Sequence, residues 1–116
     1  MNHKRQLGMT IAVISASMTT PGHKSLIVFA TYPHFRAYYR EFIEMYTRRG
    51  AEWRSATKEL RFPNGSVVRF DVVDQHIAPR HYGQLLDWFE LDEEIDPDLH
   101  RLLAEMLTVL RRKETH

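Results

Sequence analysis

Residues Leu26–Ala30, with the sequence LIVFA, form a short unbroken apolar run of β-branched, aromatic and small side chains. A strand with one solvent-exposed face alternates apolar and polar residues, whereas a strand that is covered on both faces has a continuously apolar sequence. The run therefore predicts a central strand of a sheet. Thr31 or Tyr32 is placed to cap a helix directly after it, with Pro33 in the first helical turn.

Helical spacing follows this strand. Apolar residues at intervals of three and four predict a helix over Pro33–Arg49 that stops at Gly50, and a last helix over Asp98–Arg112. The segment Met9–Met18 is apolar on most sides and fits either a buried helix or a strand. The two predicted core stripes are Phe35, Tyr38, Tyr39, Phe42, Ile43 and Tyr46 in the first helix and Leu99, Leu102, Leu103, Met106, Leu107 and Leu110 in the last.

Between the two helices the pattern changes to alternation. Lys58–Phe62 and Val67–Val73 alternate on either side of Asn64-Gly65, which predicts an antiparallel hairpin. Leu85–Leu91 is a further strand, and Trp88 on it is expected in the core. We therefore predict a three-layer α/β domain with a partly parallel sheet, in which Leu26–Ala30 and Leu85–Leu91 run parallel as neighbours or near-neighbours.

Composition narrows the class of protein. The chain has 116 residues, which is the size of one domain, and 16 basic against 15 acidic residues leave a net charge of +1. This balance does not favour bulk attraction to polyanions, although a local patch remains open. There are no cysteines, so disulfides and thiolate metal sites are excluded. No apolar stretch is long enough to cross a bilayer and no signal peptide is visible, so we expect no membrane partner and an intracellular location.

An acidic run closes the last predicted strand. Residues 87–94 read DWFELDEE, and carboxylates follow the apolar segment at once. In P-loop nucleotidases one carboxylate at the carboxyl end of a buried strand holds the magnesium ion, and the next orients the attacking water. Asp92 and Glu93 match these roles in order. Adjacent residues of a strand point to opposite sides, so the two can share a site only if the strand ends between them, and we predict that Glu93 already lies in loop geometry. The alternative is a plain strand end followed by an acidic helix start.

The segment Arg5–Thr10, RQLGMT, has part of the pattern of a phosphate loop. Such a loop uses glycine for close approach of the backbone, lysine for the phosphates and Ser or Thr for the metal. Gly8 and Thr10 fit, but Met9 stands where the lysine belongs. The alternative is an irregular N-terminal arm.

Histidines and arginines offer two further patterns. There are seven histidines, and His76 with His81 or His3 with His23 could pair, but neither pair shows the i, i+4 helix spacing with an acidic partner that metal sites on helices use, so the sequence does not favour a structural metal site. An arginine-rich set either faces DNA or forms a solvated surface; it comprises Arg36, Arg40, Arg48, Arg49, Arg54 and Arg61.

Taken in order, five segments resemble the ATPase domain of the large terminase subunits of tailed phages, which translocate DNA into procapsids. The resemblance covers Lys4 to about Arg112. The matching segments are RQLGMT, VFATYPHFRAYYREF, ELRFPNGSVVRF, RHYGQLLDWFELDEE and the closing helix.

The resemblance implies a role for each matching residue. Arg5 would be the phosphate-loop arginine that approaches the γ-phosphate, Gly8 would belong to the loop, and Thr10 would supply the magnesium hydroxyl. Asp92 would hold the metal and Glu93 would be the catalytic carboxylate. The implied cofactors are ATP and Mg²⁺, and the implied setting is the cytoplasm of a phage-infected or prophage-bearing bacterium.

The departures from the family pattern indicate an ATPase domain whose nucleotide-binding parts are incomplete. Met9 supplies no charge to the phosphates, and the strand expected before the phosphate loop is missing, so residues 1–116 read as one incomplete terminase-ATPase-like domain. Two functions follow. One is an ATPase with weak or no hydrolysis, and the other is a non-catalytic module that contacts DNA, a packaging protein or a host factor.

Overall fold

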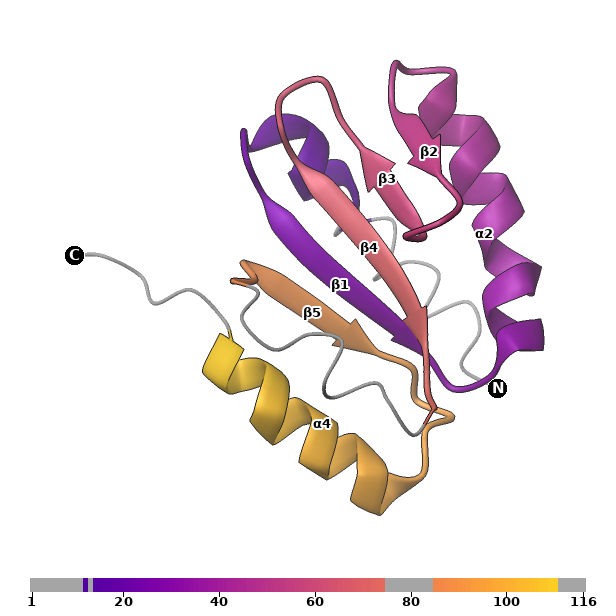
Figure 1. Ribbon diagram of the computed structural model, residues 1–116, viewed down its shortest axis with the longest axis vertical. Coiled ribbons are helices and arrows are strands. Elements are labelled where there is room, and N and C mark those ends of the chain that lie inside the picture. The colour runs from indigo at the N-terminus through magenta and orange to yellow at the C-terminus, as the bar shows by residue number, and fades with distance from the viewer. Residues whose placement is uncertain (1–11, 13, 75–84, 111–116) are drawn as a thin grey trace.

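The structure is a computed structural model, and it describes residues 12, 14–74 and 85–110. Its sheet contains five strands and is flanked by helices (Figure 1). Residues 14–19 are helical and precede the first strand. The remaining elements in chain order are β1 (Lys24–Phe29), α2 (Tyr32–Thr47), β2 (Glu52–Arg54), β3 (Glu59–Arg61), β4 (Val67–Val72), β5 (Trp88–Leu91) and α4 (Pro97–Leu110).

The sheet is mixed, with strand order β2-β3-β4-β1-β5. Strand β1 is central and runs parallel to both β4 and β5. Strand β3 is antiparallel to β2 and to β4. The predictions of an α/β sheet, of a central strand at LIVFA with a parallel neighbour at Leu85–Leu91, and of an antiparallel hairpin are therefore confirmed. The likeness to P-loop domains stays a prediction.

Strand β1 separates two hydrophobic clusters, because successive side chains of a strand point to opposite faces. Ile27 and Phe29 pack with residues of α2 such as Phe42. Leu26 and Val28 pack instead with residues of α4 such as Leu107. Helices α2 and α4 thus cover opposite faces of β1, which explains why LIVFA is apolar throughout (Figure 1).

The ends of α2 are encoded locally. The Thr31 side chain caps the helix by accepting a hydrogen bond from the backbone N–H of His34 at 3.2 Å, and Pro33 lies in the first turn. Gly50 follows the last turn with φ +96°, a conformation that glycine adopts without strain. The predicted start and stop of this helix are confirmed, so the position of its N-terminus beside β1 follows from sequence.

The hairpin between β3 and β4 differs from the two-residue turn that Asn-Gly most often forms. Gly65 takes a positive φ of 86°, but Asn64 does not. The Gly65 N–H donates to the Phe62 carbonyl at 3.0 Å, and the Phe62 N–H donates to the Ser66 carbonyl at 2.9 Å. The connection is therefore a three-residue loop with glycine in its last position, the next most common hairpin type after the two-residue turn.

Three sequence expectations are corrected. Strand β2 was not predicted, because three residues are too short a segment for alternation to be recognised. Trp88 was expected in the core, yet it is 40% exposed and its indole N–H donates to the Glu90 carboxylate at 2.7 Å. Leu102 was placed in the core stripe of the last helix and is 58% exposed, since α4 buries a narrower stripe around Leu103 and Leu107. Among the helices that the structure describes, none has the length and apolar character needed to cross a membrane.

Candidate functional site

Asp92 lies at the carboxyl end of β5 and joins that strand to β1. Its backbone N–H donates to the Val28 carbonyl at 2.9 Å, which extends the parallel pairing by one residue beyond the strand. Its side chain is fully buried. One carboxylate oxygen, Oδ2, accepts the Ala30 N–H at 2.8 Å, and the other, Oδ1, accepts the Glu94 N–H at 3.1 Å. Each oxygen of the buried carboxylate thus accepts a backbone hydrogen bond, and the two bonds fix the orientation of the side chain.

His34 reaches the same carboxylate from the first turn of α2. The Nδ1 atom of its ring is in hydrogen-bond contact with Asp92 Oδ2, and both side chains are buried. Aromatic rings fix the imidazole: Phe29 lies edge-on at 5.6 Å and Tyr38 at 5.1 Å between ring centroids. The strand-to-helix connection that follows β1 thus carries a histidine to the end of β5.

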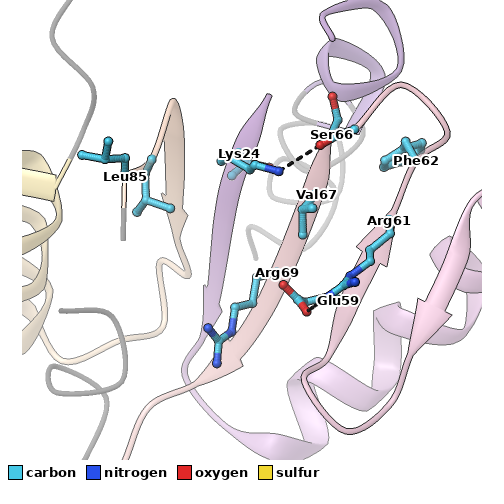
Figure 2. A pocket seen from close by; sticks show the side chains of 11 residues that line it. Lys24, Glu59, Arg61, Phe62, Ser66, Val67, Arg69 and Leu85 are labelled. Atoms are coloured by element: carbon cyan, nitrogen blue, oxygen red, sulfur yellow. Dashed lines mark hydrogen bonds and ion pairs between the residues drawn. The ribbon is translucent and has the colours of Figure 1, made fainter. Parts of the chain in front are cut away.

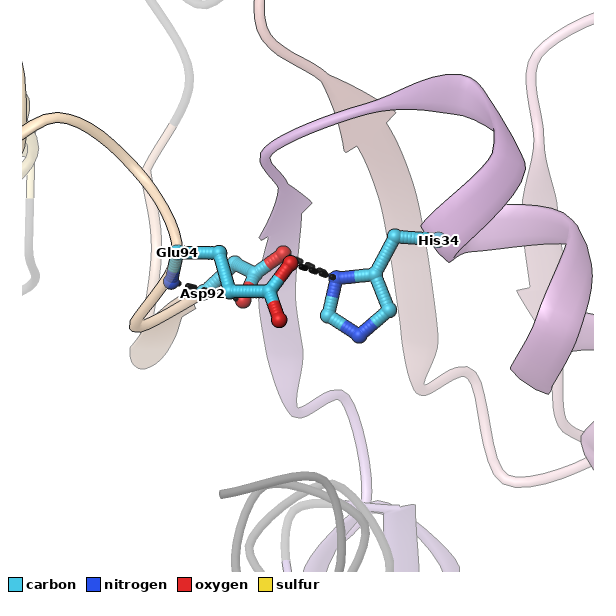
Figure 3. A group of neighbouring side chains, drawn as sticks. All are labelled: His34, Asp92 and Glu94. Carbon is cyan, nitrogen blue, oxygen red and sulfur yellow. Dashed lines mark hydrogen bonds and ion pairs between the residues drawn. The ribbon is translucent and has the colours of Figure 1, made fainter. Parts of the chain in front are cut away.

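Glu94 completes the group from the turn after β5. Its carboxylate Oε2 lies 3.8 Å from His34 Nδ1, and its side chain is 56% exposed. The ligand atoms of His34, Asp92 and Glu94 all lie within 4.8 Å of one another (Figure 3). Imidazole and carboxylate groups at this separation are the donor set of many divalent-metal sites. We name these three residues the edge cluster.

The edge cluster acts electrostatically on Tyr38. Burial raises the pKa of the Tyr38 phenol, and the negative charges of Asp92, Glu94 and Glu41 raise this pKa further. The phenol therefore stays protonated over the physiological range. Its proton can be donated in a hydrogen bond beside the edge cluster.

Of the site residues predicted from the sequence, the structure describes Asp92 and Glu93. Asp92 ends β5 as predicted, and Glu93 lies in the following turn and is exposed, which confirms that Glu93 has left strand geometry. Arg5, Gly8 and Thr10 lie outside the described residues. Their proximity to Asp92 remains a prediction.

Sequence reasoning missed His34 and Glu94. His34 is 58 positions from Asp92, so no local spacing links them. Parallel topology supplies the link, because the carboxyl ends of β1 and β5 meet at one edge of the sheet. A search for polar residues just after each predicted strand would have found the pair. Of the histidine pairs considered from sequence, His23 lies 3.4 Å from the Ser17 hydroxyl, and the other members lie outside the described residues.

A second feature is an open pocket of about 730 Å³ on one face of the sheet (Figure 2). Residues of β1, β3 and β4 line it, together with Leu85 and Leu86. Its lining includes three cations, Lys24, Arg61 and Arg69, and one carboxylate, Glu59. The Arg61 guanidinium lies 3.2 Å from the Glu59 carboxylate, and the Lys24 ammonium donates to the Gly65 carbonyl at 2.9 Å. The lining has an excess of positive charge.

The groups around Glu59 determine the charge of its carboxyl in this pocket. Burial alone raises the pKa of the Glu59 carboxyl, but hydrogen bonds from the side chains of Thr57 and Arg61, with the charges of Arg61 and Arg69, lower that pKa overall. Glu59 is therefore ionised at neutral pH and neutralises part of the basic lining. Arg69 is its direct cross-strand neighbour.

The remaining arginines of the predicted patch divide between two places. Arg36, Arg40, Arg48 and Arg49 lie on or just after α2 and are exposed, whereas Arg54 and Arg61 belong to β2 and β3. Arg54 forms an ion pair with Glu52 at 3.2 Å. The exposure of the four arginines on or just after α2 fits both a solvated helix face and a surface that faces DNA. Comparison of the chain with models of protein families, with curated proteins and with solved structures found no match.

Proposed function

We propose that the chain is a nucleotide-binding domain of the terminase large-subunit type, which binds Mg-ATP weakly and hydrolyses little or none by itself. The observation that carries this proposal is the position of Asp92. It ends a strand that runs parallel to the central strand β1, at the edge where open α/β sheets bind ligands. Glu93 follows in a turn and is exposed, as a carboxylate that orients water needs to be.

In this proposal the roles follow the resemblance. Asp92 holds the magnesium ion and Glu93 orients the water. Thr10 supplies the metal hydroxyl, and Arg5 and Gly8 meet the phosphates. Met9 removes the charge that would stabilise the transferring phosphoryl group, and electrostatic stabilisation is most of this chemistry. Weak binding and negligible turnover are the expected consequence.

The test restores the missing charge. We expect negligible ATP hydrolysis by the wild type, and we expect Met9→Lys to raise the affinity for Mg-ATP about tenfold or more, since a charge-assisted hydrogen bond contributes roughly 1.5–3 kcal/mol. Isothermal titration with Mg-ATP and a phosphate-release assay measure both quantities.

The control adds the same charge elsewhere. Met45 is a part-exposed methionine on α2, and Met45→Lys should leave the affinity for Mg-ATP unchanged. Robust turnover by the wild type, abolished in Glu93→Gln, would contradict the weak-hydrolysis proposal. Absence of binding by both the wild type and Met9→Lys would contradict nucleotide binding as a whole.

The second candidate is a non-catalytic module that contacts DNA, and the basic pocket of Lys24, Arg61 and Arg69 favours it. Contacts between cations and phosphates weaken as salt concentration rises, because counterions are released on binding. We expect a labelled DNA duplex to bind in a salt-dependent manner in fluorescence anisotropy. Arg69→Ala should reduce the slope of log affinity against log salt by about one.

The matched comparison is Arg40→Ala, which removes an exposed cation from α2. Little change in this variant is expected if the pocket is the contact. A larger loss in Arg40→Ala than in Arg69→Ala would place the contact on the helix instead. Equal binding by all three proteins would argue against either surface.

A further inference from the structure

We propose that the edge cluster is a binding site for a divalent first-row transition metal such as Zn²⁺, with His34 Nδ1, Asp92 and Glu94 as its protein ligands. The inference shares Asp92 with the proposed function but does not need a nucleotide. It names a different ligand set, because the resemblance assigns neither His34 nor Glu94 to a metal.

The separations suit a small metal coordination sphere. Bonds of about 2.0–2.2 Å to nitrogen and oxygen place the ligand atoms of a tetrahedral site roughly 3.3–3.6 Å apart. His34 Nδ1 and Glu94 Oε2 are 3.8 Å apart, close to this range. His34 Nδ1 and Asp92 Oδ2 now share a hydrogen bond. For a metal to bind, the proton between these two atoms has to leave Nδ1: a neutral imidazole shifts it to Nε2 and an imidazolium releases it to solvent, so that Nδ1 offers its lone pair to the metal and the two atoms move apart.

The two buried ligands are held in place by groups that do not bind the metal. The Ala30 N–H donates to Asp92 Oδ2, and the Glu94 N–H donates to Asp92 Oδ1. Each carboxylate oxygen has two lone pairs, so Oδ2 can keep the bond from Ala30 while it gives the lone pair now facing His34 to a metal. Hydrogen bonds that orient metal ligands in this way are a general feature of metal sites.

Glu94 provides the entrance to the site. Its side chain is 56% exposed, whereas His34 and Asp92 are buried. An ion arriving from solvent therefore meets Glu94 first and then the buried pair. Three protein ligands leave room for water as a further ligand.

The imidazole decides the class of metal. Mg²⁺ and Ca²⁺ prefer oxygen ligands, whereas an imidazole nitrogen beside carboxylates suits Zn²⁺ and neighbouring first-row metals. The edge cluster should therefore prefer Zn²⁺ or Co²⁺ over Mg²⁺. This preference separates the inference from the magnesium role that the resemblance implies.

The experiment is a titration of the metal-free chain with Co²⁺ in the absence of nucleotide, followed by visible absorption, and then displacement of Co²⁺ by Zn²⁺. We expect one equivalent of Co²⁺ to bind with visible bands, and Zn²⁺ to abolish them. A millimolar excess of Mg²⁺ should not. Thermal unfolding with and without Zn²⁺ provides a second readout, because a ligand that binds the folded state raises its melting temperature.

The variant Glu94→Gln removes the exposed ligand without disturbing the buried pair, and it should weaken Co²⁺ binding roughly 10–100-fold. Glu105→Gln is the matched control: it alters an exposed carboxylate on α4, away from the edge cluster, and should bind Co²⁺ like the wild type. The absence of Co²⁺ bands in a folded wild type, or equal weakening by both variants, would overturn the inference. Co²⁺ binding without Mg-ATP binding would overturn the proposed function alone, and the reverse result would overturn this inference alone.

Discussion

Replacing Phe70 by alanine is expected to lower the free energy of unfolding by about 3–5 kcal/mol. Phe70 lies on β4, is 1% exposed, and contacts the rings of Phe29, Phe35, Phe42 and Trp53 at centroid distances of 6.0–6.4 Å. Truncation removes the buried area and also leaves a cavity between β1, α2 and β2 that packed neighbours cannot fully close. Urea denaturation followed by circular dichroism measures the change.

Two further variants make this result interpretable. Phe70→Leu keeps most of the volume and should lose clearly less than Phe70→Ala. Leu102→Ala truncates a large apolar side chain that is 58% exposed, and it should change the free energy of unfolding by no more than about 0.5 kcal/mol. A loss in Leu102→Ala comparable to that in Phe70→Ala would contradict the placement of Phe70 in the core and of Leu102 at the surface.

Removing the carboxylate of Asp92 is expected to cost about 3 kcal/mol or more, although Asp92 is polar. Asp92→Ala leaves the N–H groups of Ala30 and Glu94 without the acceptor they now have, and it deprives the buried His34 of its partner. A donor that loses its acceptor in a water-excluded site costs about 1–3 kcal/mol, and the loss of the hydrogen bond between His34 and Asp92 adds to this cost. Urea denaturation without added metal gives the value.

The control for Asp92 is its neighbour in sequence. Glu93 is exposed in the turn, so Glu93→Ala should leave the free energy of unfolding within about 0.5 kcal/mol of the wild type. A small loss in both variants would mean that the junction of β1, β5 and α2 does not depend on the buried carboxylate. Hydrogen exchange at Ala30, whose N–H bonds to Asp92, offers an independent check at one position.

The fold was largely predictable because its strongest signals are local. LIVFA is apolar throughout because helices cover both faces of β1, and Thr31 and Gly50 mark the ends of α2 by capping chemistry that acts within a few residues. Trp88 and β2 were not predictable in the same way. Their environments depend on which strands become neighbours, and this information is not carried by any short window of sequence.

Only part of the candidate site could be predicted from the sequence. Asp92 and Glu93 follow a recognisable strand, so their place at its carboxyl end could be read from the pattern. His34 follows a different strand, and its approach to Asp92 depends on the adjacency of β1 and β5 and on the exact first turn of α2. A histidine in a helix start has no distinguishing local pattern. The place of His34 in the site follows from the order of the strands in the sheet.

The central position of β1 also has a consequence for how the chain acquires its structure. Both strands that flank β1 lie later in the chain: β4 begins at Val67 and β5 at Trp88. During synthesis from the N-terminus, the ribosome therefore releases the most hydrophobic strand well before either of its partners exists. Hairpin β3–β4 pairs locally and can form early, whereas the sheet closes around β1 last. We therefore expect nascent LIVFA to be open to chaperones and to aggregation until β4 and β5 have been synthesised, and its burial to come late in folding.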